Sequence, residues 1–397
     1  MTRLSMNSKQ LPVDWQIKPL GDVLKLEYGK PLPKDQRDDD GKFLAYGANG
    51  IKCRTNNFYW DKPSIIVGRK GSAGEVNLTL GKFWPLDVTY FVVFDEHQYD
   101  LMFLYYCLIC LNLQSLAKGV KPGINRNDVY SIECGFPPRP EQKRIVAILD
   151  EAFAGITQAV TNAEKNLANS RELFESYLNS GFTQKSEGWT EKRLGELGKI
   201  TSSKRIFKRE YTDTGIPFYR TKEVKEKANG RDITTELFIA EERYNEIKQK
   251  FGIPQKGDIL LTAIGTIGEA FVVDGQEDFY FKDGNVLWLK KFNAVNSYFL
   301  RYVLMAFVEN LKRMSHGSAY NALPIEKLKN HTIHLPSSDE QLQIVSRLDA
   351  MHSVTQRLET IYQQKLTALA ELKRAILQKA FTGELTADTV YQQVVNG

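Results

Sequence analysis

The stretch PPRPEQKRIVAILD, residues 137–150, returns later in this 397-residue chain as LPSSDEQLQIVSRLD, residues 335–349. Both copies have a proline within their first two residues and share a Glu-Gln pair followed by Ile-Val and Leu-Asp, which recur at an offset of 199 (340 − 141 = 199). Proline is tolerated at the start of a helix and disfavoured inside one, so each copy predicts the beginning of a helix. The offset stays at 199 as far as Phe182-Thr183, which return as Phe381-Thr382. We therefore expect two long helices of equal length.

Shorter repeats precede each of these helices. The segment from Trp15 to Gly21 returns as Trp189 to Gly195, and Gly71–Glu75 (GSAGE) returns as Gly265–Glu269 (GTIGE). The offset grows from 174 (189 − 15) to 194 (265 − 71) and then to 199, so the second copy carries insertions in its loops. The chain is thus predicted to contain two similar but unequal domains and two matched helices.

The repeat sets the expected domain boundaries. We expect a first domain at residues 1–138, a central long helix at 139–182, a second domain at 183–336, a C-terminal long helix at 337–382 and a tail at 383–397. Short runs rich in β-branched and aromatic residues, such as Ser64–Val67 and Val88–Val93, predict strands between glycine-rich turns. Residues 100–116 and their counterpart 296–314 have helical spacing of apolar residues. Each domain is therefore predicted to be α+β.

Both long helices carry a stripe of mainly apolar residues at alternating steps of three and four, which favours a coiled coil. The stripe of the first helix includes Ile145, Leu149, Ile156 and Leu173, and that of the second has Thr355 as a polar member. The simplest arrangement is an antiparallel pair within the chain, in a circular, pseudo-two-fold arrangement with the two termini close together. The alternatives are that each helix lies along its own domain or pairs with a partner protein.

The amino-acid composition limits the class of protein to which the chain can belong. Charged residues make up 25% and hydrophobic residues 42% of the chain, which is ordinary for a globular protein and excludes disordered and collagen-like classes. The net charge of +5 permits a nucleic-acid partner without requiring one. Four cysteines are too few for a disulfide framework in a chain of this size, and no apolar stretch is long enough for a membrane span. A cytoplasmic location is expected.

Several motifs occur in a fixed order, and two of them occur twice. They are W-x4-L-G at Trp15 and Trp189, GRKGSAGEV at residues 68–76, the two proline-led helix starts, and AFTGEL at residues 380–385. In this order the chain resembles, over essentially its whole length, the specificity subunit (HsdS) of Type I DNA restriction-modification systems. The second copy departs from the glycine motif, with Ala263-Ile264 where the first has Arg69-Lys70.

The resemblance implies a DNA-recognition protein without catalytic chemistry of its own. Each domain would be a target recognition domain that reads one half of an asymmetric, interrupted DNA site, and the paired helices would set the gap. The implied partners are double-stranded DNA, two modification (methyltransferase) subunits and up to two restriction/translocase subunits. Those partners, and not this chain, would use S-adenosylmethionine, ATP and Mg²⁺. A complex with the methyltransferase alone is an open alternative.

Candidate DNA contacts follow from residue type, because Asn and Arg suit bidentate contacts with adenine and guanine, and Lys and Arg suit phosphates. In the first domain they lie in the loop YGANGIKCRTNN and beside the glycine motif: Tyr46, Asn49, Lys52, Arg54, Asn56, Asn57, Arg69 and Lys70. In the second domain the repeat alignment suggests Ser203, Lys204, Arg205, Arg220, Thr221 and Lys222. An ordinary polar loop is the alternative, since turns favour Asn and Gly for backbone reasons.

Other patterns favour structural roles. The glycine pairs Gly71/Gly74 and Gly265/Gly268 predict tight turns, because their spacing does not match a nucleotide-binding loop. Cys107 and Cys110 form a lone CxxC among leucines, which favours core packing over a zinc site. Asp87 and Asp283 recur in FWPLD and FYFKD and could ligate a metal or, more simply, cap turns. His331 and His334 are expected in a strand.

No Walker A loop, dinucleotide fingerprint, zinc-protease motif or amino-methyltransferase motif is present, so no catalytic residues and no metal ligands are predicted. The competing hypothesis is a coiled-coil scaffold that organises other proteins without sequence-specific DNA readout. Salt dependence separates the two, because phosphate neutralisation makes affinity fall steeply with salt.

Overall fold

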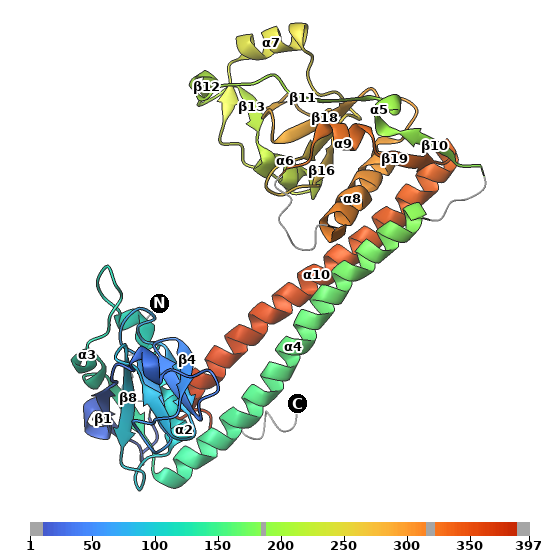
Figure 1. Ribbon diagram of the computed structural model, residues 1–397. Coiled ribbons are helices and arrows are strands. Elements are labelled where there is room, and N and C mark those ends of the chain that lie inside the picture. Colours follow the sequence, from blue (N-terminus) through green and yellow to red (C-terminus); the bar gives the residue numbers. More distant parts are fainter. Residues whose placement is uncertain (1–10, 184–187, 315–321, 387–397) are drawn as a thin grey trace. The chain divides into compact units, whose positions relative to one another are not determined.

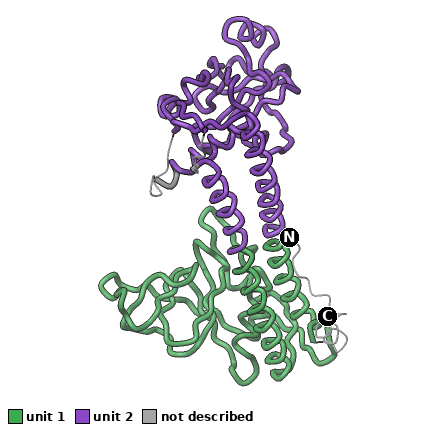
Figure 2. The backbone as a smooth tube through the Cα atoms, turned by 90° about the vertical axis from the view of Figure 1, so that its right-hand side faces the viewer, with its two compact units in different colours: residues 1–164, 364–397 green, residues 165–363 purple. Residues whose placement is uncertain are grey.

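The computed structural model describes residues 11–183, 188–314 and 322–386. The chain forms two compact units, which Figure 2 shows in green and purple. Unit 1 contains residues 1–164 and 364–397, and unit 2 contains residues 165–363. The division falls inside both long helices, α4 (Arg139–Thr183) and α10 (Ser338–Phe381), so each unit holds part of each helix. Within the described residues, no helix has the length and apolar character that a membrane span requires.

Unit 1 is built around an antiparallel four-stranded sheet with the order β2-β8-β5-β6. These strands are Leu24–Tyr28 (β2), Thr89–Phe94 (β8), Ser64–Gly68 (β5) and Val76–Thr79 (β6). A smaller sheet has the order β4-β3-β7, from Gly50–Thr55, Phe43–Gly47 and Phe83–Pro85. A third sheet pairs β1 (Gln16–Pro19) with β9 (Glu133–Phe136). The helices are α1 (Leu20–Val23), η1 (Lys34–Gln36), α2 (Leu101–Cys110), η2 (Leu113–Leu116) and α3 (Arg126–Tyr130).

Unit 2 repeats this plan with additions. Its main sheet has the order β11-β18-β15-β16, from Lys199–Ser202, Val286–Lys290, Ile259–Thr262 and Ala270–Val272. A second sheet has the order β12-β14-β13-β17, from Tyr211–Thr212, Phe238–Ile239, Ile216–Tyr219 and Tyr280–Phe281. The third sheet pairs β10 (Thr190–Arg193) with β19 (Thr332–Leu335). The helices are α5 (Leu194–Leu197), η3 (Lys208–Glu210), α6 (Thr221–Ala228), α7 (Glu241–Lys250), α8 (Ser297–Met314) and α9 (Ile325–Lys329).

The predicted α+β duplication is confirmed. The four-stranded sheets have the same strand order, and in both units a strand near the unit's start pairs with the strand before a long helix (Figure 1). The loop insertions expected in the second copy include α6 and α7, which lie between β11 and β15. The predicted division into recognition domains at residues 138, 182, 336 and 382 stays a prediction, since the compact units divide the chain elsewhere.

The long helices lie antiparallel within each unit. In unit 2 the Arg171 guanidinium of α4 lies 3.4 Å from the Glu359 carboxylate of α10, and Phe174 stacks on His352 at 4.7 Å between ring centroids. In unit 1 the Lys373 ammonium lies over the ring of Phe153, 5.0 Å from its centroid. The residue numbers of contacting pairs fall on one helix as they rise on the other, which confirms the predicted intramolecular pair.

The seam differs from the predicted stripe at a leucine on each long helix. Ile145, Leu149 and Ile156 are buried as expected, but Leu173 of α4 is 50% exposed, and Leu372, predicted in the stripe of α10, is 47% exposed. Steps of four and three from Ala163 lead to Ser170 and Phe174, so Leu173 points about 100° away from the seam. Thr355, the predicted polar member, is buried and donates its hydroxyl proton to the backbone of its own helix.

Matching contacts fasten each unit's sheet region to its long helix. The Tyr106 hydroxyl of α2 donates to the Asp150 carboxylate of α4 at 2.5 Å, and the Tyr302 hydroxyl of α8 donates to Asp349 of α10 at 2.5 Å. Burial and the neighbouring carboxylate raise the pKa of both tyrosines, so these hydroxyls stay protonated. The glutamines of the repeated Glu-Gln pair, Gln142 and Gln341, accept from the backbone N–H that precedes α2 and α8.

The last turns of α10 complete the core of unit 1. Leu377, Ala380 and Phe381 of α10 are buried beside α2, and the Phe381 ring packs 5.2 Å from that of Phe103. Gly383 then lies so close to Pro12 that a Cβ there would fall 2.3 Å from the proline ring. The two ends of the described chain therefore meet within unit 1, as the repeat predicted.

Candidate nucleic-acid interface

The predicted contact loop of unit 1 is the hairpin formed by β3 and β4. Asn49 is exposed at its two-residue turn, and Lys52 is exposed on the second strand. Tyr46, in contrast, is only 6% exposed and packs edge-on against Phe83. The tip of the hairpin therefore offers Asn49 and Lys52 to a ligand, while Tyr46 belongs to the core that supports it.

The other candidates of this loop hold the loop itself together. The Arg54 guanidinium donates to the Gly41 carbonyl at 2.6 Å. The Asn56 amide donates to Asp38 at 2.9 Å, and the Asn57 amide donates to Gln36 at 3.4 Å. All three side chains are exposed, so these bonds fix their position without burying them.

Arg69 and Lys70 follow β5 at the start of the glycine motif. The Arg69 guanidinium donates through Nε and Nη2 to the Asp87 carbonyl, at 3.1 and 2.6 Å, and lies over the ring of Tyr28. Lys70 is exposed and forms a bridge with Gly123. Gly71 and Gly74 have φ values of +81° and +87°, and a Cβ at Gly74 would fall 2.4 Å from the Gln114 nitrogen, so the motif is a tight turn against η2.

Two residues that sequence reasoning missed complete this surface. The Arg126 guanidinium lies 5.2 Å from the centroid of the Tyr28 ring, on which Arg69 also packs at 5.4 Å. Tyr28 itself is 46% exposed. Tyr28, Arg69 and Arg126 lie far apart in the chain, and no local motif joins them. The only signal in the sequence is that all three positions differ in the second copy.

In unit 2 the six predicted residues fall into two groups. Arg220, Thr221 and Lys222 come directly after β13, at the positions that Gly47, Ala48 and Asn49 occupy at the end of β3, which places them where the hairpin tip lies in unit 1. Both cations of this group are paired. Arg220 contacts Glu223 at 2.6 Å and Glu236 at 2.9 Å, and Lys222 contacts Glu236 at 3.2 Å. The hydrogen bond that the Arg220 guanidinium donates to the Glu223 carboxylate raises the pKa of Arg220, and Arg220 together with Lys222 lowers the pKa of Glu236.

The second group, Ser203 to Arg205, follows β11 and is therefore equivalent to the residues after β2, not to the hairpin. Ser203 donates to the Phe281 carbonyl at 2.8 Å, and Arg205 contacts the Asp283 carboxylate at 2.8 Å. Asp283 thus pairs with a cation, whereas Asp87 of unit 1 offers its carbonyl to Arg69. The Lys204 ammonium lies over the ring of Phe251, which is 48% exposed.

A further basic and aromatic pair lies beside Lys204. Phe207 is 52% exposed, and the Arg209 guanidinium lies 5.4 Å from the centroid of its ring. Exposed rings flanked by cations are suited to stacking on bases and neutralising phosphates. Sequence reasoning stopped at Arg205 and missed Phe207, Arg209 and Phe251.

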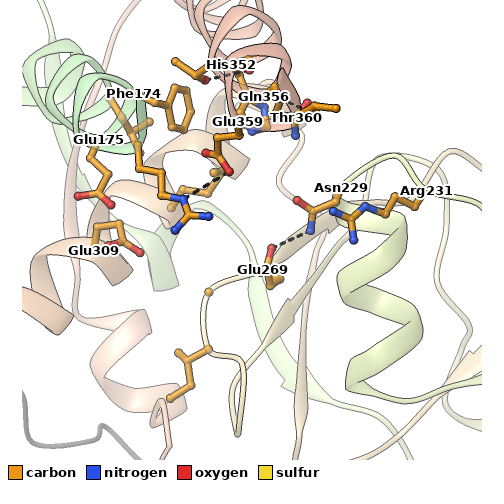
Figure 3. Close-up of a pocket in the computed structure, with 16 residues that line it drawn as sticks. Phe174, Glu175, Asn229, Arg231, Glu269, Glu309, His352, Gln356, Glu359 and Thr360 are labelled. Atoms are coloured by element: carbon orange, nitrogen blue, oxygen red, sulfur yellow. Dashed lines mark hydrogen bonds and ion pairs between the residues drawn. The ribbon is translucent and has the colours of Figure 1, made fainter. Parts of the chain in front are cut away.

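Unit 2 also contains a pocket of about 460 Å³ between its helices and the second glycine motif. In this pocket Phe174 stacks on His352, and Arg171 pairs with Glu359. Figure 3 shows Asn229 joined to Glu269 on the opposite side of the pocket from Phe174. Burial lowers the pKa of His352, so this side chain is neutral at pH 7. The lining carries charges of both signs, and its contacts join the glycine motif to Asn229 and α4 to α10.

The cysteines and histidines singled out in the sequence have structural positions. Across residues 11–183, 188–314 and 322–386, no group of three or more His, Cys, Asp or Glu side chains could hold a metal ion. Cys107 is buried in the core of unit 1, where a contact with Cys134 and burial raise the pKa of its thiol. Burial raises the pKa of Cys110 to about 12. His334 lies in β19 and His331 just before it.

Two similar α+β units, each with exposed cations and aromatic rings, together with a shared pair of antiparallel helices, define a duplicated DNA-recognition protein. The chain belongs to the family of the Type I restriction modification DNA specificity domain, whose family model matches residues 12–167 and again residues 186–368. It is a specificity subunit of a Type I restriction-modification system.

Relatives span nearly the whole chain. A Haemophilus influenzae protein assigned to the type I restriction enzyme specificity subunits is 28% identical over 86% of this chain and 88% of its own length. The Type I restriction enzyme MjaVIII specificity subunit of Methanocaldococcus jannaschii is 24% identical over 96% of this chain and 95% of its own. A solved chain of a type I R-M system matches 95% of this chain and 100% of its own, with a TM-score of 0.75 at 20% identity, which shows a shared fold.

Proposed function

We propose that each unit reads one half of an asymmetric, interrupted double-stranded DNA site, and that α4 and α10 set the gap between the halves. In this proposal the same helices dock two modification (methyltransferase) subunits, and the complex can recruit two restriction/translocase subunits. The chain has no catalytic role of its own. S-adenosylmethionine, ATP and Mg²⁺ serve the partner subunits, in the cytoplasm.

The observation that carries this proposal is one backbone plan bearing two different surfaces. The four-stranded sheets share their strand order, yet the exposed residues that follow equivalent strands differ. After β3, unit 1 presents the hairpin tip with Asn49 and Lys52, whereas unit 2 presents the start of α6 with Arg220 and Lys222. Direct readout depends on which donors and acceptors reach the base edges, so two such surfaces suit two different half-sites.

The side chains assigned to contacts with DNA remain predictions. In unit 1, Asn49 and Lys52 are proposed to reach base edges, and Arg69 and Lys70 to reach phosphates. In unit 2, Lys204, Arg205, Arg220, Thr221 and Lys222 are proposed to face DNA, with Ser203 holding the backbone beside them. The ion pairs of Arg205, Arg220 and Lys222 would open or rearrange when DNA binds.

The test is to express the chain with its methyltransferase subunit and map methylated bases across a genome by single-molecule sequencing. We expect one interrupted, asymmetric motif, methylated on both strands. Substitution of Asn49 by Ala should relax the requirement at one half of the motif and leave the other half unchanged. An active methyltransferase complex that methylates no defined motif would overturn the recognition role and favour a scaffold.

A further inference from the structure

Two arginines share one tyrosine ring at the surface of unit 1. The Cζ atoms of Arg69 and Arg126 lie 5.4 and 5.2 Å from the centroid of the Tyr28 ring. A guanidinium over an aromatic face is held by the negative face of the ring. Because Tyr28 is 46% exposed, both cations are held at a position that a ligand can reach.

Backbone contacts fix the positions of both arginines. The Ile124 N–H donates to the Arg69 carbonyl at 3.0 Å, which ties the glycine motif to the segment that leads into α3. The Asp87 carbonyl accepts two N–H groups of the Arg69 side chain. A guanidinium has five such groups, so three remain for a ligand. The Arg126 backbone contacts the hydroxyl of Tyr90, which packs beside Tyr28 at 5.1 Å.

Neither guanidinium is neutralised within the described part of the chain. No carboxylate oxygen there lies within 4 Å of Arg69 or Arg126, since Asp128 contacts Lys118 instead, at 2.9 Å. Two further cations, Lys70 and Lys121, are exposed on the segments that Gly123 bridges. Like charges held this close repel one another, so the arrangement favours an anion.

Unit 2 has the same backbone arrangement without these side chains. Its Leu323 N–H donates to the Ala263 carbonyl at 2.9 Å, as Ile124 donates to Arg69, and Ile264 bridges Ala322 as Lys70 bridges Gly123. At the positions of Tyr28, Arg69 and Arg126, unit 2 has Ser202, Ala263 and Ile325. The offsets are 174 (202 − 28), 194 (263 − 69) and 199 (325 − 126), as in the flanking repeats. The fold therefore does not require the three side chains, and they are present or absent as a set.

We propose that Arg69 and Arg126, positioned by Tyr28, form a clamp for one phosphate group of the DNA backbone, and that this clamp exists in unit 1 alone. The inference rests on the proposed function and names a phosphodiester as the ligand. Planar guanidinium groups match the oxygens of a phosphate in pairs, and such contacts fix the register of a protein on DNA without reading its sequence. Unit 2 fixes its register through other residues.

The first experiment compares DNA binding by the complete complex with its methyltransferase subunit, across a range of salt concentrations. The variants are Arg69→Ala, Arg126→Ile and the two combined. The matched control is Lys62→Ala, an exposed cation of unit 1 whose ammonium lies 3.0 Å from Glu96. Loss of a charged hydrogen bond predicts roughly tenfold weaker binding for each single variant. The slope of log K against log salt should fall by about 0.9 in the double variant, as for one lost phosphate contact.

Sequence preference should not change, because a phosphate contact weakens matched and mismatched sites alike. Tyr28→Ser, which introduces the unit 2 residue, should weaken binding, and Tyr28→Phe, which keeps the ring, should retain more affinity than Tyr28→Ser. Circular dichroism and thermal unfolding of each variant report whether the fold is intact. A double variant that is folded and has the affinity and salt slope of Lys62→Ala overturns the clamp.

A second experiment locates the phosphate. Single phosphates of the unit 1 half-site are replaced, one at a time, by uncharged methylphosphonates. At one position, the replacement should lower the affinity of the unaltered complex by about the same factor as the Arg126→Ile substitution does. In the Arg126→Ile complex, the same replacement should lower the affinity by a much smaller factor. Equal losses in both complexes at every position overturn the clamp. If the unaltered complex itself shows no salt-dependent, site-specific binding, the proposed function fails, which is a separate outcome.

Discussion

At the scale of single residues, the burial of His331 predicts that the stability of the protein depends on pH. Its ring lies 4.0 Å from that of Phe307, and burial lowers its pKa to about 4. The unfolded chain, in which the pKa is about 6.5, binds a proton more readily, so the free energy of unfolding must fall as pH falls from 6.5 towards 4. Between pH 8 and pH 5, His331 should lower the free energy of unfolding by about 2 kcal/mol.

The matched variant is His331→Ile, because Ile132 occupies the equivalent position of unit 1 (331 − 132 = 199). Denaturant unfolding at pH 8 and pH 5 should show a smaller loss of stability for the variant. His352, whose pKa burial also lowers, contributes in the same direction, so some pH dependence should remain. A variant with the full pH dependence of the original protein would show that His331 is not the titrating group.

The residues proposed to contact DNA differ in how far the sequence points to them. Arg69 and Lys70 belong to a recurring motif, which made them candidates from the sequence alone. Tyr28 and Arg126 lie in other segments, and only strand register and the bond between Ile124 and Arg69 bring them together. Tyr46 was predicted to contact DNA because it begins a polar loop, but it lies in β3 and faces the core.

At the scale of elements, the bonds from Tyr106 and Tyr302 to the long helices predict a defined loss of stability. Tyr106→Phe removes the hydroxyl of a buried tyrosine, which donates to the exposed Asp150 carboxylate at 2.5 Å, and leaves that carboxylate with one donor fewer. A hydrogen bond to a charged group contributes about 1.5–3 kcal/mol, and we expect a loss of that order in the free energy of unfolding.

The matched control for this prediction is Tyr105→Phe. Tyr105 is the neighbouring tyrosine, and burial is the only cause that raises its pKa. Chemical denaturation should show a change within about 0.5 kcal/mol for the control. Tyr302→Phe should lower the stability of unit 2 by a similar amount, because its bond to Asp349 has the same length. Equal stabilities of Tyr105→Phe and Tyr106→Phe would contradict a stabilising role for the Asp150 contact.

Elements with a repeated pattern were predicted well. The proline-led starts and the stripe of apolar residues indicated both long helices, and the structure confirms their antiparallel pairing within each unit. The failure at Leu173 is informative, since a leucine one step from the seam looks like a seam residue when only apolar character is read. The elements of the unit 2 insertion, such as α6 and α7, have no counterpart in the first copy and could not be predicted by comparing the two.

At the scale of the whole molecule, the proposed function makes the length of the helix pair a measure of the gap. Residues 157–163 of α4 and 364–370 of α10 face each other, as the contact of Phe153 with Lys373 shows. Deletion of both segments shortens each helix by about 10 Å, which corresponds to about three base pairs. The methylated motif should then keep both halves and lose about three bases from its gap.

Deletion from α4 alone is the control for this experiment. It shifts one helix against the other and breaks the pairing of seam residues, so it should reduce motif-specific methylation instead of altering the gap. An unchanged gap after the paired deletion would show that the helices do not set the spacing.

The completion of unit 1 by Leu377, Ala380 and Phe381 has a consequence for the order of events during synthesis. A ribosome makes the sheets of unit 1 first, but it translates the residues that close their core only after all the sheets of unit 2. Until then, Phe103 and its neighbours lack the ring of Phe381, and unit 2 can pack before unit 1 does. A nonsense codon just before Leu377 should therefore damage the first recognition surface, far away in the sequence, as severely as it damages the helix that it shortens.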